Sequence, residues 1–335
     1  MPSENFRGYL VTKSSDGVVA GSVAQLNIAD LPPGDVLIRV AYSSLNYKDA
    51  LAATGHPGVV KQLPHVPGID AAGVVVESQS AQFTPDQEVL VTSYELGAGR
   101  WGGFAEYVRV PGEWVVPLPA GLSLRESMAL GTAGFTAAQC VEALLKHGVA
   151  PEQGEIVVTG ASGGVGSWAV AILYKLGYTI AAVSGKAAAH EYLNQLGAAR
   201  VLGRTEVDDH GGQPLLKARW AGAVDVAGGN VLATVLRSSK NGGCVTACGL
   251  TAGTDLPLTV YPFILRGVTL AGIDSAWCAM PRRRAIWHKL ASDWKSDAFD
   301  RIVTKTIGLS DVAASVKEIL AGNQLGRVLV EPGRA

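Results

Sequence analysis

A glycine-rich turn between an apolar run and a helical segment is the part of this sequence best suited to bind a phosphate group. The turn Thr159-Gly160-Ala161-Ser162-Gly163-Gly164-Val165-Gly166 follows the apolar stretch 155–158. Glycines let the backbone approach a pyrophosphate, and the first free amides of the following helix point at its oxygens. We expect Ser162, Gly163, Gly164 and Val165 to contact a dinucleotide, with the helix opening at Ser167. The alternative is an ordinary glycine-rich turn.

The next expected strand covers 179–183, and the segment after it indicates which dinucleotide binds. This segment is Ser184-Gly185-Lys186 and contains no carboxylate. An acid at this place would accept a hydrogen bond from the ribose 2′-hydroxyl of NAD and would repel the 2′-phosphate of NADPH. Arg204, just past the third strand, can add a bidentate phosphate contact. The sequence therefore predicts NADPH; the alternative is that Lys186 is a solvated residue at a helix start.

The elements that must position these residues fall into two patterns. Up to about residue 116, short strands such as 35–40, 72–76 and 88–91 are broken by glycine and proline, which predicts a β-rich domain. A helix is expected over 124–147, with Ser123 as its N-cap. From residue 154 strands alternate with helices, which predicts an α/β fold with a doubly wound parallel sheet. The expected strands of this sheet are 156–159, 179–183, 200–202, 223–226, 243–247 and 268–271, and the helices between them include 170–176 and 190–196.

The last part of the sequence returns to the first pattern. Helices are expected over 281–294 and 311–320, and a closing strand over 327–330. We therefore predict one domain made of 1–124 and 273–335, with a dinucleotide-binding domain inserted over 125–272. Apolar residues make up 48% of the 335 residues, enough for two separate cores.

The overall charge and the scattered cysteines exclude several classes of partner. Lys and Arg number 28 and Asp and Glu 29, so the chain has no general electrostatic attraction for nucleic acid or an anionic membrane. We see no N-terminal basic segment followed by an apolar one, as a secretory signal would have. We also find no uncharged apolar run of about 18 residues, the length that spans a membrane. The four cysteines and six histidines show neither CxxC nor HxxxH spacing. We expect a cytoplasmic protein with reduced thiols and no metal.

Several motifs resemble the medium-chain dehydrogenase/reductase superfamily. They are Asn46-Tyr47-Lys48-Asp49 within 43–50, Pro67-Gly68-Ile69-Asp70 within 67–73, Trp101-Gly102-Gly103-Phe104 within 101–107, and the segments 131–137 and 243–250. The sequence is most similar to the quinone-oxidoreductase-related branch, and within it to bacterial NADPH-dependent acryloyl-CoA reductases. This resemblance implies a GroES-like catalytic domain, a Rossmann domain and a homodimer.

The chain lacks the zinc ligands of its zinc-dependent relatives. Those relatives place a cysteine near Asn46-Tyr47, a histidine at Ile69 and a cysteine near 131–133, where this sequence has none. Without a Lewis acid, reduction of a C=C bond conjugated to a carbonyl is easier than reduction of a ketone. It needs a donor for the enolate oxygen and a proton source.

Tyr47 is the first candidate for binding or protonating the enolate, since it offers an O–H in the segment that carries the catalytic ligand of zinc relatives. Asn46 can donate its amide to the same oxygen, and Asp49 can orient either residue. Each has a structural alternative. Asn46 and Asp49 also form an N-cap with an acid in the first turn of a helix over 47–53, and Tyr47 can be a packing residue.

The resemblance implies further contacts with the nicotinamide half of the cofactor. By the family's pattern these come from Tyr47, Thr132, Leu250, Ile264, Ser275 and Asn323. Arg282-Arg283-Arg284 can bind the 3′-phosphate of CoA, although a solvated helix start is the simpler interpretation. The predicted activity is reduction of acryloyl-CoA to propanoyl-CoA. The alternatives are reduction of quinones or free enones, and a nucleotide-binding protein without activity.

Overall fold

The computed structural model describes residues 4–334, which divide into two compact units. Unit 1 contains residues up to Thr132, Ala276–Ala291 and the chain from Val303 on; unit 2 contains Ala133–Ser275 and Ser292–Ile302. The division differs from the predicted boundaries at 124/125 and 272/273. It also assigns 292–302 to unit 2, where the sequence pattern indicated a return to the first domain.

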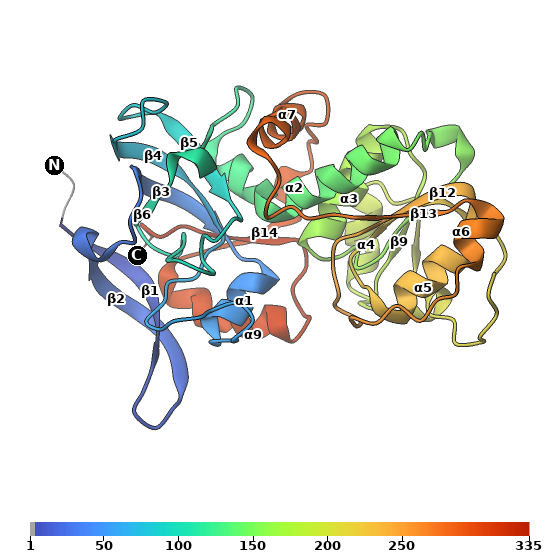
Figure 1. Ribbon diagram of the computed structural model, residues 1–335, viewed down its shortest axis with the longest axis horizontal. Coiled ribbons are helices and arrows are strands. Elements are labelled where there is room, and N and C mark those ends of the chain that lie inside the picture. The colour runs from blue at the N-terminus through green and yellow to red at the C-terminus, as the bar shows by residue number, and fades with distance from the viewer. Residues whose placement is uncertain (1–3, 335) are drawn as a thin grey trace. The chain divides into compact units, whose positions relative to one another are not determined.

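Unit 1 is built around a seven-stranded sheet and a separate hairpin. The path of the sheet is β14-β15-β3-β4-β5-β7, with β6 also paired to β3. The hairpin of β1 (Asn5–Lys13) and β2 (Val19–Asn27) is the long blue ribbon in Figure 1. The sheet strands are β3 (Val36–Ser44), β4 (Asp70–Ser78), β5 (Glu88–Thr92), β6 (Tyr107–Val110), β7 (Val116–Pro117), β14 (Val303–Ile307) and β15 (Arg327–Val330). The three strands predicted near the N-terminus and the closing strand are confirmed.

Two helices from distant parts of the sequence lie together in unit 1. Helix α1 (Tyr47–Ala53) follows β3 directly, and α9 (Val312–Leu320) precedes β15; the two contact each other (Figure 1). Their apolar faces join a core that includes Phe6, Leu45 and Phe104. A third helix, α7 (Met280–Ala291), is shorter than the predicted 281–294. Burial of these faces fixes the first turn of α1, where the candidate residues lie.

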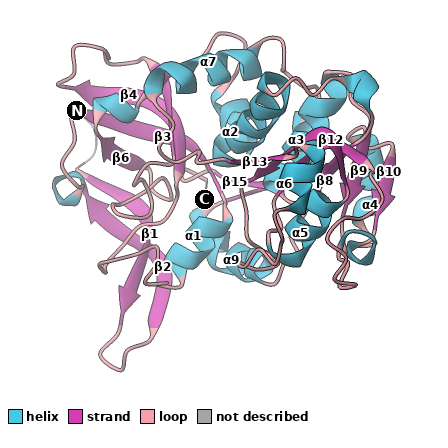
Figure 2. Cartoon of the chain, turned by 45° about the vertical axis from the view of Figure 1, so that its right-hand side comes forward, coloured by secondary structure: helices cyan, strands magenta, loops and turns pink. Residues whose placement is uncertain are grey.

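Unit 2 contains a six-stranded parallel sheet in the order β10-β9-β8-β11-β12-β13. All six predicted strands are present, with ends shifted by up to four residues. They are β8 (Ile156–Val158), β9 (Ile180–Val183), β10 (Arg200–Leu202), β11 (Trp220–Asp225), β12 (Ser239–Ala247) and β13 (Thr269–Gly272). The associated helices are α3 (Gly164–Lys175), α4 (Ala189–Gln195), α5 (Gly229–Arg237), α6 (Tyr261–Arg266) and α8 (Phe299–Ile302). Figure 2 shows these magenta strands flanked by cyan helices, and the strand order confirms the doubly wound sheet.

The longest helix, α2 (Leu124–Lys146), begins as the sequence predicts. Ser123 and Glu126 form a capping box, because Glu126 N–H donates to Ser123 Oγ and Ser123 N–H donates to the Glu126 carboxylate. Within residues 4–334, α2 is the one helix long and apolar enough to cross a membrane. However, 83% of its most apolar stretch is buried inside the protein, as in a core helix. The helix is broken at Gly131, where φ is 51° and ψ is −156°.

Candidate active site and dinucleotide site

Asp49 holds the first turn of α1 and a neighbouring loop together. One carboxylate oxygen, Oδ2, accepts the Asn46 backbone N–H at 2.8 Å, and the other, Oδ1, accepts the N–H groups of Gly68 and Ile69 at 3.0 and 2.7 Å. The side chain is fully buried. Burial, followed by the charge of Asp70, raises the pKa of Asp49 to about 7, while these hydrogen bonds act in the opposite direction.

A second buried carboxylate, Asp70, lies at the start of β4 and accepts hydrogen bonds at both oxygens. Thr132 donates its hydroxyl to Oδ1 at 2.6 Å, and Ser44 donates its hydroxyl to Oδ2 at 2.6 Å. The Thr132 N–H also points at the carboxylate, at 3.0 Å. This N–H is available because the break at Gly131 interrupts the helix one residue earlier.

The Arg327 guanidinium brings a positive charge into the same cluster. It donates to Ser44 Oγ at 2.5 Å and to Asn46 Oδ1 at 3.0 Å, and its Nη2 lies 3.7 Å from Asp70 Oδ2. Arg327 is 2% exposed. Burial lowers the pKa of Arg327, and the two carboxylates act against this. Two acids and one cation are thus buried together away from solvent. Their hydrogen bonds offset part of the desolvation cost of burying these groups.

The Asn46 amide is directed into this cluster. Its Nδ2 lies within hydrogen-bond distance of Ser44 O, Asp49 Oδ2 and Asp70 Oδ2, while its Oδ1 accepts from Arg327. The expectation that Asn46 donates to a substrate oxygen is therefore not favoured by the geometry, because its amide hydrogens point at acceptors of the protein. The capping interpretation accounts for Asn46 and Asp49 better.

Tyr47 differs from its buried neighbours. It is the first residue of α1, and its side chain is 48% exposed. The alternative that it is only a packing residue is correspondingly weak. The buried cluster fixes the residue before it, so Tyr47 is an exposed side chain on an anchored helix start.

A left-handed corner after β5 contains two residues that the sequence analysis did not single out. Ser93 has φ 63° and Tyr94 has φ 51°, an uncommon conformation for residues other than glycine. The Ser93 hydroxyl lies 2.8 Å from Thr132 Oγ1. Tyr94 stacks on Trp114, with ring centroids 5.1 Å apart. No sequence pattern marks such a corner, since neither residue type favours it.

Arg283 supports this corner, which corrects one expectation about the three arginines. Its side chain is fully buried, lies 4.3 Å over the Tyr94 ring, and donates to Thr92 O and Ala276 O. Burial lowers the pKa of Arg283. It is therefore not available to a CoA phosphate, whereas Arg282 and Arg284 are exposed.

In unit 2 the glycine turn lies between β8 and α3, as predicted. Gly163 is the N-cap of α3, so the helix begins at Gly164 rather than at the expected Ser167. Gly164 and Val165 therefore carry free N–H groups in the first turn. A Cβ on Gly166 would lie 2.4 Å from Gly160 O, so only glycine fits there. Below the turn, Thr159 donates to buried Asp225 at 2.7 Å.

The residues expected at the adenosine phosphate also come together. Ser184 donates to Ser162 Oγ at 3.1 Å, and Lys186 N–H donates to Ser184 Oγ at 3.2 Å. Arg204 packs against Gly185, where a Cβ would meet its Nε at 2.8 Å. Burial, followed by the Arg204 charge, lowers the pKa of Lys186. Two neighbouring cations beside hydroxyl and amide donors fit a phosphate dianion.

The other four residues implied by the resemblance do not form a cluster with each other in the structure. Leu250 and Ile264 are exposed, at 60% and 68%. Ser275 accepts a hydrogen bond from Thr136 Oγ1 at 2.8 Å, and Asn323 is exposed in unit 1. Their contacts with a cofactor stay predictions.

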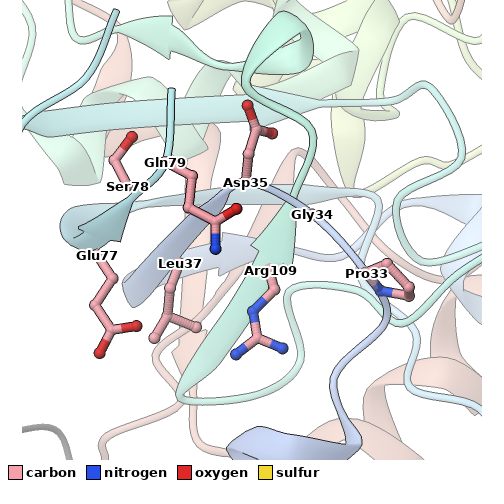
Figure 3. A pocket seen from close by; sticks show the side chains of 8 residues that line it. All are labelled: Pro33, Gly34, Asp35, Leu37, Glu77, Ser78, Gln79 and Arg109. Atoms are coloured by element: carbon pink, nitrogen blue, oxygen red, sulfur yellow. The ribbon is translucent and has the colours of Figure 1, made fainter. Parts of the chain in front are cut away.

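A surface hollow in unit 1 contains none of the predicted site residues. Figure 3 shows it over β3, β4 and β6, with Glu77, Leu37 and Arg109 on three neighbouring strands. Pro33, Gly34, Asp35, Ser78 and Gln79 complete the lining. It lies at the opposite end of β3 from Ser44, so it is separate from the buried cluster.

Comparisons with known proteins agree with this architecture. Residues 32–120 match the family model described as an alcohol dehydrogenase GroES-like domain, and residues 164–291 match the one described as a zinc-binding dehydrogenase. A protein of Escherichia coli named "Probable acrylyl-CoA reductase AcuI" is 50% identical over 96% of this chain and 98% of its own length. The chain belongs to the medium-chain dehydrogenase/reductase superfamily.

A second curated relative from this superfamily carries a different name. "Putative quinone oxidoreductase YhfP" of Bacillus subtilis is 47% identical over 97% of this chain and 98% of its own length. A solved structure of B. subtilis yhfP with NAD bound has a TM-score of 0.95 at 47% identity, covering 98% of this chain and 100% of that chain. A solved structure of E. coli YHDH with bound NADPH has a TM-score of 0.93 at 49% identity, covering 96% and 99%.

Proposed function

We propose that this chain is an NADPH-dependent reductase that acts on the C=C bond of an α,β-unsaturated acyl-CoA thioester, converting acryloyl-CoA to propanoyl-CoA. The observation that carries the substrate is the full-length similarity to a protein named acrylyl-CoA reductase. The cofactor assignment is supported by Lys186 and Arg204, which lie together beside Ser184.

Tyr47 is the residue that we propose for the substrate's oxygen or for the proton. When bound, NADPH supplies a hydride for the β-carbon, after which negative charge develops on the thioester oxygen and the α-carbon takes a proton. Tyr47 is exposed and begins α1. Asn46 and Asp49 act as positioning residues, because Asp49 accepts the N–H of the residue that precedes Tyr47.

The chain's own residues argue for a reaction without a catalytic zinc. At the place of the zinc histidine stands Ile69, whose N–H donates to Asp49. The oxygens of Asp49 and Asp70 already accept N–H or O–H donors, and Arg327 supplies the positive charge. A metal ion would have to displace these donors.

Reduction of quinones or free enones is the second candidate, favoured by the name of the B. subtilis relative. It uses the same hydride and the same donor. A nucleotide-binding protein without activity is the third, and the exposed Tyr47 side chain, which offers a proton donor, argues against it. We further propose a cytoplasmic homodimer that binds neither nucleic acid nor membranes. The near-zero net charge supports the latter. The exposed Val260, Ile264 and Leu265 near edge strand β13 support the dimer.

The test is an acceptor and cofactor matrix with the purified chain. Acryloyl-CoA, free acrylate and a quinone are each assayed with NADPH and with NADH by loss of nicotinamide absorbance. We expect the highest kcat/KM for acryloyl-CoA with NADPH. Strong turnover of the quinone but not of acryloyl-CoA would overturn the substrate, and equal efficiency with NADH would overturn the cofactor. Tight NADPH binding without turnover of any acceptor would favour the inactive alternative.

A further inference from the structure

The hydroxyl of Tyr192 links α4 to the first turn of α3. It donates to Ser167 Oγ at 2.8 Å, and Ser167 Oγ in turn donates to Ala161 O at 3.2 Å. Burial raises the pKa of Tyr192 to about 12, so the hydroxyl keeps its hydrogen at neutral pH. Ser167 has one hydroxyl hydrogen, so it receives from Tyr192 and gives to Ala161. A side chain of α4 thereby holds a carbonyl group of the glycine turn in place.

The glycine turn is also held by β9 and the segment after it. The Ala161 N–H donates to Val183 O at 3.0 Å, and Ser184 donates its hydroxyl to Ser162 Oγ at 3.1 Å. Ala161 is fully buried, so neither of its backbone groups can bond to water instead. One of these groups is therefore fixed to the end of β9, and the other is fixed to α3.

The two links make a closed network through α4. From β9 the chain runs through 184–186 into this helix, where the Ala189 N–H donates to Lys186 O at 3.0 Å. The Lys186 N–H donates back to Ser184 Oγ at 3.2 Å. From α4, Tyr192 returns to the glycine turn. The network therefore contains both segments that we expect to bind phosphate, the turn for the pyrophosphate and 184–186 for the 2′-phosphate.

A ligand that carries both groups meets the two segments at a spacing set by its own covalent structure. It binds with full strength only if the protein holds the same spacing beforehand, because otherwise part of the binding free energy is lost in ordering the segments. A ligand with only one of the two groups does not sense the spacing. Without the Tyr192 hydroxyl, segment 184–186 keeps its links at the β9 end and loses the hydrogen bond at the α4 end.

We propose that Tyr192 is a positioning residue for the selection of NADPH over NADH. Its hydrogen bond to Ser167 holds segment 184–186 at the distance from the glycine turn at which one ligand can use both its pyrophosphate and its 2′-phosphate. The inference rests on the proposed NADPH-dependent function. It assigns part of the selection to a hydroxyl that bonds to the protein itself, in addition to the groups expected to contact the 2′-phosphate.

The test uses three ligands without nicotinamide, which probe the two phosphate-binding segments. ADP-ribose carries the pyrophosphate, 2′-AMP carries the 2′-phosphate, and 2′-phospho-ADP-ribose carries both. Their dissociation constants are measured by calorimetry with the full chain. Tyr192→Phe keeps the aromatic ring and removes the hydroxyl. It should weaken binding of 2′-phospho-ADP-ribose about fivefold to tenfold, the worth of one hydrogen bond, and change the other two constants less than about twofold.

Tyr178→Phe is the matched control. The Tyr178 hydroxyl also donates to a buried partner in unit 2, Val149 O at 2.6 Å, but it lies outside the network. This variant should leave all three constants unchanged. Ser167→Ala removes the acceptor of Tyr192, so adding Tyr192→Phe to it should weaken 2′-phospho-ADP-ribose no further. Additive effects in the double variant would show that Tyr192 does not act through Ser167 and would overturn the inference.

The outcomes distinguish this inference from the proposed function. A wild-type chain that binds ADP-ribose as tightly as 2′-phospho-ADP-ribose would contradict the proposed cofactor and the inference with it. A wild-type preference for the second ligand that stays intact in Tyr192→Phe would overturn the inference alone. Equal weakening of all three ligands in Tyr192→Phe would also overturn it, because the hydroxyl would then support the fold and not the spacing.

Discussion

Asp49, Asp70 and Arg327 form a buried group in which each charge depends on the others. The carboxylates come from α1 and β4, and the guanidinium comes from β15, nearly 260 residues further along the chain. Removing one partner from such a group costs about 3–5 kcal/mol, because an uncompensated charge is left in the interior. The group therefore acts as a unit, and it fixes the position of Asn46 and, through it, of Tyr47.

The pKa of Asp49 predicts how stability depends on pH. This pKa is about 7 in the folded chain, above the ordinary 3.8, so between about pH 4 and pH 7 the folded state binds more protons at Asp49 than the unfolded state. The free energy of unfolding should therefore decrease as the pH rises through this window, by roughly 1.4 kcal/mol per pH unit at most. Asp49→Asn should remove this slope. The measurement is urea unfolding at several values between pH 5 and 8.

The control for this experiment is Asp16→Asn at the exposed turn of the β1–β2 hairpin. The Asp16 pKa is lowered, mainly by its hydrogen bond with Ser14, so its titration lies below the tested range. This variant should keep the wild-type slope. Parallel pH profiles for the wild type and Asp49→Asn would mean that the Asp49 charge does not change between pH 5 and 8.

How much of the site the sequence could predict differs from residue to residue. Asn46, Asp49 and Thr132 were expected, because the motifs that contain them resemble known ones. Asp70 stood inside a quoted motif, yet its role depends on Thr132, 62 residues away. Arg327 and Ser93 could not be predicted, because burial and a left-handed backbone arise only when distant segments meet.

At the level of elements, the break in α2 connects secondary structure with the site. Gly131 has a backbone conformation that is almost restricted to glycine, and a Cβ there would lie 2.5 Å from Asp70 Oδ2 and 2.7 Å from Ser44 Oγ. The sequence predicted a helix over 124–147 but no break, since an apolar helical pattern continues through this residue. The N–H of the next residue, Thr132, donates to Asp70, a tertiary contact that no helical pattern indicates.

Gly131→Ala should lower the free energy of unfolding by about 3 kcal/mol or more, the sum of backbone strain and displaced polar groups. Gly177→Ala is the matched control, because Gly177 also has a positive φ, 82°, but nothing lies within 4 Å of its Cβ position. It should cost only about 1–2 kcal/mol, the strain alone. Denaturant unfolding at pH 7 measures both. Equal losses in the two variants would show that the contact with Asp70 carries no extra constraint.

At the level of the whole molecule, alternation of strands and helices predicted the doubly wound sheet and its six strands, because periodicity is a local property. The same reasoning assigned 292–302 to the first domain, whereas this segment groups with unit 2. Phe299 packs against Trp168 of α3, with ring centroids 4.9 Å apart, and this partner lies over 120 residues away in the sequence. Composition and charge predict which partners are excluded, but not which unit a short segment joins.

The proposed homodimer is tested at this scale. Edge strand β13 and the exposed side chains of Val260 and Leu265, at 63% and 58%, form the surface of unit 2 that we expect a second copy to cover. Val260→Lys should shift the chain towards monomer in sedimentation velocity at micromolar concentration. Val18→Lys places the same charge at the exposed hairpin and should leave the dimer intact. A monomeric wild type would contradict the proposal.

The position of β15 also has a consequence for synthesis on the ribosome. This strand lies between β14 and β3 in the sheet of unit 1, and it brings Arg327 to Asp70. Most of unit 2 is continuous in sequence, so it can collapse while the chain is still being translated. Unit 1 begins first but is completed last, and until the final residues emerge its two acids lack the counter-charge that lets them be buried. Premature termination before residue 327 would therefore leave the N-terminal half, although fully translated, without a finished core.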